Sequence, residues 1–97
     1  MKPVDLLPLA CQEFDASFDW YAERSAIAAE RFTQAVDAAF GMIAAHPERF
    51  AAVSPNHRGC RVERFPFRVI YRVETDRILV VAIAHAKRRP NYWQDRT

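Results

Sequence analysis

The second half of the chain gathers cationic side chains at spacings that suit the binding of anions. Before a cut between His57 and Arg58 the sequence has 4 basic and 8 acidic residues, and after it 10 basic and 4 acidic. Clustered cations raise the local potential and steer association, so this half suits nucleic acid or an acidic protein segment. The residues concerned are Arg61, Arg68, Arg72, Lys87, Arg88 and Arg89, with His85 and Tyr92 beside them.

Each of these residues also has a purely structural interpretation. Arginines at alternating strand positions often form a solvated sheet face, and a histidine at the end of a buried strand is often a hydrogen-bonded structural residue. The run Lys87-Arg88-Arg89 can lie in solvent, whereas Tyr92 and Trp93 can pack the end of the chain against the domain. The sequence leaves both interpretations open.

The two cysteines do not indicate a metal site. Cys11 and Cys60 form no CxxC pair and have no histidine at metal-ligand spacing. We expect small buried or half-buried thiols, with no metal, no cofactor and no disulfide.

The length and composition predict one domain over residues 1–97. A chain of 97 residues with 51% hydrophobic residues can order one core but not two. Residues 1–9 are too short and too interrupted by proline to be a signal peptide, and no apolar run approaches the roughly 20 residues of a membrane span. We therefore expect a cytoplasmic protein that does not enter membranes.

The first half of the sequence predicts a short edge strand and two helices. The strand spans Pro3–Leu7, and Pro8 opens a helix that runs to Arg24 with an acidic face. Ser25 is a predicted N-cap for a second helix, Ala26–His46, which Pro47 ends. The tight junction predicts an antiparallel hairpin. The apolar stripe of the second helix comprises Ile27, Phe32, Val36, Phe40 and Ile43.

After a loop at residues 48–57 the hydrophobic period changes from 3.6 to 2, which indicates strands. Strands are predicted at Arg58–Phe65 and Phe67–Val73, each with a dry face and an arginine-bearing face. The segment Ile78–His85 is apolar on both faces and is expected to be a central strand. Its two faces would be Ile78, Val80 and Ala82 on one side, and Leu79, Val81 and Ile83 on the other.

Ordered motifs along the chain give it a resemblance to a known family. In the helical half they are Asp19–Arg24, Ala29–Phe32 and Ile43–Phe50, and in the second half Arg64–Val73, Val81–His85, Lys87–Pro90, Tyr92 and Trp93. This set resembles RelE/ParE toxins, often labelled plasmid stabilisation proteins, from about Val4 to Arg96. The resemblance implies an α+β fold of order β-α-α-β-β-β, with a helical hairpin on a small, mostly antiparallel sheet.

The resemblance also implies a toxin that a cognate antitoxin neutralises in a heterodimer or larger assembly. One branch of the family cleaves mRNA on the ribosome, and the ParE branch inhibits DNA gyrase by binding it. The nuclease chemistry requires a base, an acid and cations for the charged transition state. Its candidates here are Arg61, Arg68 and Arg72 as cations, with His85, Lys87 and Tyr92 for proton transfer or base stacking.

Two departures favour the ParE-like alternative, in which the chain is not an enzyme. A net charge of +2 is small for a protein that must neutralise many phosphates. The last strand ends in Ala84, His85 and Ala86, where the nuclease branch carries an arginine. The expected gyrase-contacting residues are then Arg72, Lys87, Arg88, Arg89, Tyr92 and Trp93. A non-toxic RNA- or protein-binding module is a third possibility.

Overall fold

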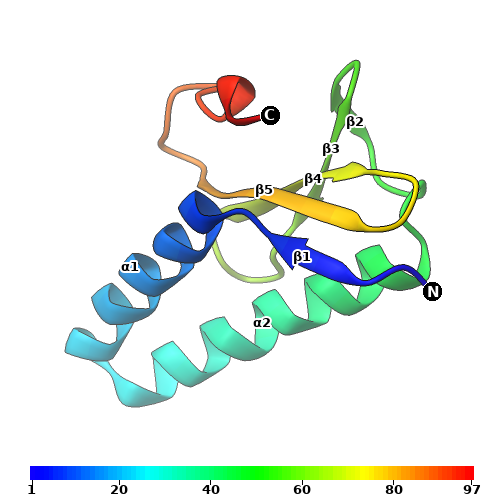
Figure 1. The fold of residues 1–97 in the computed structure, drawn as a ribbon. Helices are drawn as coiled ribbons and strands as arrows, with labels where there is room; N and C mark the ends of the chain where they lie inside the picture. The colour runs from blue at the N-terminus through cyan, green and yellow to red at the C-terminus, as the bar shows by residue number, and fades with distance from the viewer.

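The computed structural model describes all 97 residues and confirms the α+β class (Figure 1). Two helices, α1 (Pro8–Arg24) and α2 (Ala26–Ala45), pack on one face of a sheet. The predicted order is confirmed, with one additional strand. The strands are β1 (Val4–Leu6), β2 (Ala52–Ser54), β3 (His57–Arg61), β4 (Phe67–Val73) and β5 (Ile78–His85), and a 3-10 turn, η1 (Gln94–Arg96), follows them.

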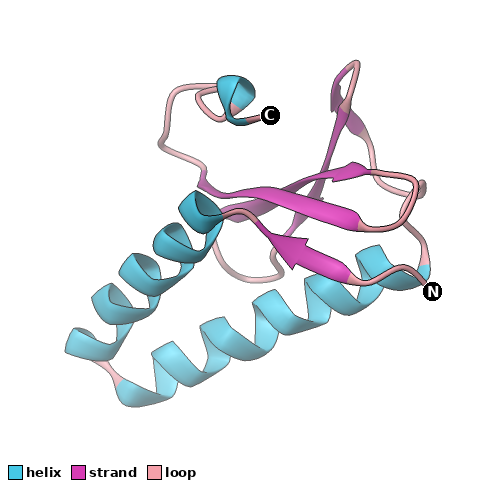
Figure 2. Ribbon diagram, in the orientation of Figure 1, coloured by secondary structure: helices cyan, strands magenta, loops and turns pink.

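The five strands form a single sheet in the order β1-β5-β4-β3-β2 (Figure 2). Strand β1 is parallel to β5, and all other neighbours are antiparallel. Strand β5 therefore lies inside the sheet, as its two apolar faces predict. Strand β1 pairs only with Ile78, Leu79 and Val80 of β5, so the second half of β5 has no neighbouring strand on that side.

The helical hairpin forms where the sequence predicts it. Pro8 occupies the first turn of α1, where its missing N–H removes no hydrogen bond. The Ser25 hydroxyl accepts the backbone N–H of Ala28 at 3.2 Å and so caps α2. The helices diverge from this junction as a V whose tip projects beyond the sheet (Figure 1).

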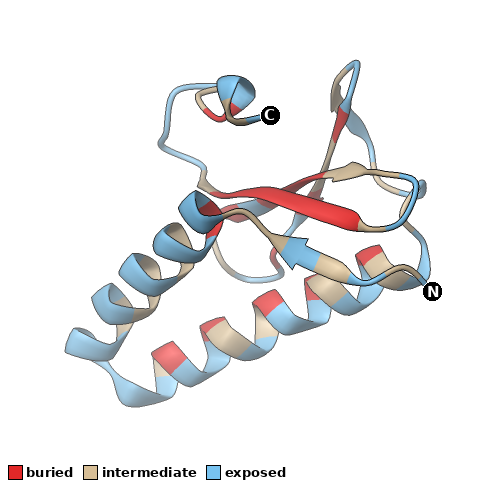
Figure 3. Ribbon diagram, in the orientation of Figure 1, coloured by how far each residue is buried: buried red, intermediate tan, exposed pale blue.

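The main core lies between α2, α1 and the sheet (Figure 3). Phe32, Val36 and Ile43 of α2 are at most 1% exposed, which confirms most of the predicted stripe. Ile27 is an exception: it is 61% exposed because it lies in the first turn of α2, at the projecting tip. Phe40 is half-buried at the margin of the core. Of the two cysteines, Cys60 is buried as expected, whereas Cys11 is exposed, contrary to expectation.

Two strand boundaries differ from the prediction. The expected loop at residues 48–57 contains β2, whose three residues are too few to show a period, and it also contains the first residue of β3. The strand expected to reach Phe65 ends at Arg61, because the chain turns there and Arg64 adopts a left-handed conformation with φ of 70°. The backbone N–H of Val62 donates to the carbonyl of Phe67 across this turn at 3.0 Å.

A β-bulge changes which residues of β5 face the helices. Ile70 pairs with Ala82 and Tyr71 with Val80, so Val81 is an extra residue in β5. Ile78, Val80 and Ile83 consequently share the main core. The predicted alternation is wrong from Ala82 onward, because the extra residue Val81 inverts the facing of the residues that follow it.

Candidate target-binding site

The C-terminal segment, residues 86–97, crosses the sheet face that lies opposite the helices (Figure 1). Trp93 is 3% exposed and packs with Ile70, Val81 and Ala82 in a second hydrophobic cluster. Ile70, which alternates with Arg68 and Arg72 and so shares their face of β4, is therefore buried by this segment. Trp93 therefore holds the segment on the sheet, which agrees with the structural interpretation of this residue given by the sequence.

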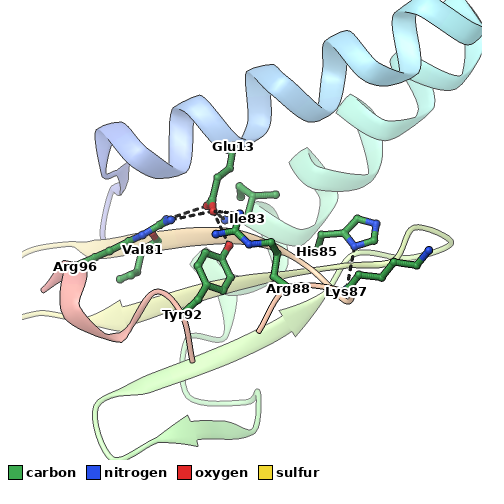
Figure 4. Close-up of polar contacts among 8 residues, drawn as sticks. All are labelled: Glu13, Val81, Ile83, His85, Lys87, Arg88, Tyr92 and Arg96. Carbon is green, nitrogen blue, oxygen red and sulfur yellow. Dashed lines mark hydrogen bonds and ion pairs between the residues drawn. The ribbon is translucent and has the colours of Figure 1, made fainter. Parts of the chain in front are cut away.

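Glu13 of α1 is the polar anchor of the C-terminal segment (Figure 4). Its side chain is 14% exposed, and its carboxylate accepts hydrogen bonds from both Nη atoms of Arg96, at 2.9 and 3.0 Å. The hydroxyl of Tyr92 also donates to it, at 2.5 Å. A bidentate hydrogen-bonded pair of guanidinium and carboxylate is strong and directional. Glu13 thus fixes two side chains that follow it by about eighty residues in sequence.

Glu13 and Arg96 also form hydrogen bonds with the open edge of β5. The backbone N–H of Ile83 donates to Glu13 at 3.0 Å, and Arg96 donates to the carbonyl oxygen of Val81 at 3.1 Å. Both backbone groups lie beyond the stretch of β5 that β1 covers. An unpaired strand edge is a template for unwanted pairing, and here a helix residue and a C-terminal residue cap it.

Tyr92 is engaged within the protein and is poorly suited to transfer a proton to a substrate. Burial, and secondly its hydrogen bond to Glu13, raise the pKa of Tyr92 well above its usual value. The guanidinium of Arg88 stacks over its ring at 3.9 Å from the centroid. The predicted role in acid catalysis therefore receives no support from the geometry.

His85 is the last residue of β5, and its side chain also makes contacts within the protein. Its Nδ1 accepts the backbone N–H of Lys87 at 3.0 Å, so in the neutral ring the proton lies on Nε2. The ring meets Phe67 edge to face, with 4.9 Å between centroids. These contacts hold the start of the C-terminal segment, and they leave Nε2 as a hydrogen-bond donor rather than as a base.

A hollow of about 460 Å³ lies between the sheet and the C-terminal segment, and we call it the arginine cleft. The structure brings four of the predicted arginines together there, and the lining includes no aspartate or glutamate. Phe67, Ile70 and Trp93, which also line it, are each less than 9% exposed. The four arginines are Arg61, Arg68, Arg88 and Arg89.

A second hollow, of about 570 Å³, lies between α1 and the start of the C-terminal segment, and we call it the apolar groove. Trp20, Tyr21 and Phe67 supply aromatic surface, and Lys87 lies at the groove with its charge in solvent. Trp20 is 52% exposed, and the guanidinium of Arg24 stacks on it at 3.6 Å. His85 lines both hollows.

Arg72 does not join the other predicted site residues. It pairs with the carboxylate of Glu74, to which Arg77 also donates at 2.7 Å. Hydrogen bonds from Arg77 and from Arg72 lower the pKa of Glu74. Arg72 lines a separate hollow beside His57, so its predicted contribution to the same target surface is not supported by its position.

Sequence reasoning missed Glu13, Arg96 and His57. Glu13 was predicted on the solvated face of α1, and nothing in the local pattern distinguishes it from the exposed Asp15 and Asp19. His57 is 6% exposed, with Nδ1 2.8 Å from the Ser54 hydroxyl and its ring 4.8 Å from that of Trp93. The spacing of Ser54 and His57 around a turn was the only local signal for this contact.

No group of three or more histidine, cysteine, aspartate or glutamate side chains is arranged to hold a metal ion. Neither helix combines the length and apolar character needed to cross a membrane.

Comparisons with known proteins agree with this architecture. The sequence model described as "ParE toxin of type II toxin-antitoxin system, parDE" matches residues 4–90. A solved structure described as the chromosomal ParDE TA system from P. aeruginosa superimposes with a TM-score of 0.65 at 22% identity. That likeness covers 90% of this chain and 98% of the other, and it establishes the fold. No curated protein matches the sequence.

Proposed function

Because this chain belongs to the ParE toxin family of type II toxin–antitoxin systems, we propose that it inhibits DNA gyrase in the cytoplasm by binding it. One observation carries the proposal. Lys87, Arg88 and Arg89 form an exposed cationic run that is fixed at both ends. The hydrogen bond from the backbone N–H of Lys87 to His85 fixes the start of this run. The hydrogen bonds of Tyr92 and Arg96 to Glu13 fix the chain that follows it. A pre-ordered cationic surface loses little entropy on binding.

The hydrogen bonds of the candidate site favour binding over bond cleavage. Cleavage of mRNA on the ribosome would require an acid and a base within reach of the reacting phosphate. The Tyr92 hydroxyl donates a hydrogen bond to Glu13, and Nδ1 of His85 accepts one from the backbone N–H of Lys87. The alternative of a ribosome-dependent endonuclease is therefore the weaker hypothesis.

We assign the cognate antitoxin to the apolar groove. A flexible partner gains affinity from apolar anchors, and Trp20 offers exposed aromatic surface there. Arg24 and Lys87 at the groove favour carboxylates next to those anchors. An antitoxin segment that alternates apolar and acidic side chains matches this surface, and it would lie against the first residue of the cationic run.

The test of gyrase binding compares two triple variants, each of which loses three positive charges. Replacing Lys87, Arg88 and Arg89 by alanine should abolish inhibition of gyrase supercoiling. The control replaces Arg31, Arg49 and Arg64, which are exposed and lie outside the site, and should retain inhibition. Exposed substitutions usually change stability by less than about 0.5 kcal/mol each, so both variants should fold.

Two results would reject the proposal. The first is wild-type protein that leaves supercoiling unaffected while mRNA is cut in the ribosomal A site. The second is equal loss of inhibition in the two triple variants. For the antitoxin, Trp20→Glu should weaken the toxin–antitoxin complex, whereas Asp15→Lys, on the same helix, should not.

A further inference from the structure

Two arginines of the arginine cleft face each other across neighbouring strands. Arg61 of β3 is the direct partner of Arg68 in β4, and both side chains are exposed. Like charges at directly opposed positions destabilise a sheet. Neither arginine takes part in an ion pair of the structure. The pair is therefore a concentrated positive charge that nothing within the protein neutralises.

Gly59 gives the Arg68 side chain its place in this cleft. A Cβ atom at Gly59 would lie 2.5 Å from Cδ of Arg68 and 3.1 Å from its Cγ. It would also lie 3.1 Å from Cγ1 of Val53 on the other side. Gly59 has no positive φ, so space rather than backbone conformation explains the glycine. The aliphatic part of Arg68 lies over Gly59, so a side chain at position 59 would displace it.

The C-terminal segment completes the cleft with further positive charge. Arg88 and Arg89 line it, and Arg88 is held by stacking on Tyr92 and lies 4.0 Å from Glu13. No carboxylate lines the cleft. Phe67, Ile70 and Trp93 are already buried by the protein itself, so these three side chains offer a peptide little apolar surface to cover. The four guanidinium groups give the cleft its positive charge and its N–H donors.

We propose that the arginine cleft binds the phosphodiester backbone of a single-stranded nucleic acid without cutting it. Guanidinium groups match phosphate oxygens with paired hydrogen bonds, and two adjacent arginines suit successive phosphates. A hollow of about 460 Å³ suits a flexible strand better than a rigid duplex. The Tyr92 hydroxyl is hydrogen-bonded to Glu13, and Nδ1 of His85 is hydrogen-bonded to the backbone N–H of Lys87. Neither side chain therefore offers the bound phosphate a free base. This activity goes beyond gyrase binding and does not depend on it.

The test measures binding of the purified chain to labelled single strands by fluorescence anisotropy, in the absence of gyrase. DNA and RNA of one sequence and about 12 nucleotides form two arms. Contacts with about three phosphates predict that the logarithm of Kd rises with that of salt with a slope near 2. Arg61→Gln and Arg68→Gln should each weaken binding roughly tenfold and reduce the slope by about 0.7.

Two further variants separate charge from position. Gly59→Ala keeps every arginine but displaces the side chain of Arg68, so it should weaken binding as Arg68→Gln does. Arg31→Gln removes an exposed charge of α2 and should bind like the wild type. Thermal melting reports whether each variant is folded, and Arg61→Gln tests the cleft without altering the close contact at Gly59.

Binding by either strand type, with these variant effects, supports the proposal, and the difference between the arms identifies DNA or RNA as the source of the phosphates. Failure of both strands to bind at about 50 mM salt would overturn it. Equal weakening by Arg31→Gln would also overturn it, because nonspecific charge would then explain binding. Displacement by polyglutamate at equal charge concentration would identify a peptide site instead, and cleavage of the RNA would refute binding without chemistry.

Discussion

The Glu13 carboxylate joins three parts of the chain that are remote in sequence. It accepts hydrogen bonds from Ile83, Tyr92 and Arg96, and its side chain is 14% exposed. Loss of the carboxylate would leave the Arg96 guanidinium, itself only 13% exposed, without its partner. A poorly hydrated and unpaired charge is strongly unfavourable, so the effect should exceed that of a surface ion pair.

We predict that Glu13→Ala lowers the free energy of unfolding by about 2–4 kcal/mol. The melting temperature should fall by roughly 10 °C or more in a domain of this size. Asp15→Ala, an exposed carboxylate of the same helix, is the control and should change stability by less than about 0.5 kcal/mol. Similar melting temperatures for the two variants would show that the Glu13 contacts do not stabilise the fold.

His57 gives the fold a dependence on pH. Burial, and secondly the Arg72 guanidinium, lower the pKa of His57. The unfolded chain therefore takes up a proton near pH 6.5 that the folded protein still excludes. Stability should decrease as the pH falls from about 7.5 to about 5. Urea denaturation across this range should give a flatter pH profile for His57→Gln than for the wild type, while the exposed His46→Gln variant keeps the wild-type slope.

At the scale of elements, α2 supplies the centre of the main core. Phe32 is 0% exposed, and its ring lies 5.1–5.5 Å from the rings of Phe14, Tyr21, Phe65 and Phe67. These rings come from α1, from β4 and from the turn before β4. Phe32 therefore joins the helical hairpin to the sheet, whereas Ile27 of the same helix contributes little.

Phe32→Ala should lower the free energy of unfolding by about 3–5 kcal/mol, because it leaves a cavity among aromatic rings. Ile27→Ala should lower it by less than about 0.5 kcal/mol, because its side chain is 61% exposed. Chemical denaturation of both variants measures the difference. Comparable losses would contradict the assignment of the core to one face of α2. Phe40→Ala should fall between the two, since Phe40 is only half-buried.

At the scale of the whole molecule, both faces of the sheet are covered by different means. The helical hairpin covers one face, and the C-terminal segment covers part of the other through Trp93 (Figures 1 and 3). The segment is tied to α1 by Glu13 and to the hairpin of β2 and β3 by His57. The two hydrophobic clusters should therefore unfold together.

Trp93→Ala should destabilise the whole molecule by about 3–5 kcal/mol and leave a single unfolding transition. It should also expose Ile70 and Val81, which increases the binding of a hydrophobic dye by the native state. Gln94→Ala, an exposed neighbour, serves as the control and should match the wild type. If the Trp93→Ala variant unfolds with the same midpoint as the wild type, the C-terminal segment folds independently of the rest of the domain.

The sequence by itself determined the two helices, four of the five strands and the order in which they follow one another. Periods of 3.6 and 2, the cap at Ser25 and the breaks at Pro8 and Pro47 depend on neighbours within a few residues, so they can be identified without the fold. The same spacing predicted the dry face of β4, where Val69 and Tyr71 are buried. It also predicted that arginines would gather on the other face, as Arg61 and Arg68 do.

The tertiary structure alone decided which of these residues act together. Glu13 and Arg96 are 83 residues apart, and no local pattern marks either as a partner. The bulge at Val81 and the cover that Trp93 gives to Ile70 likewise depend on how distant segments pair. Local spacing determines the period of an element, whereas the partner of a polar side chain is determined by packing between segments that meet only in the folded chain.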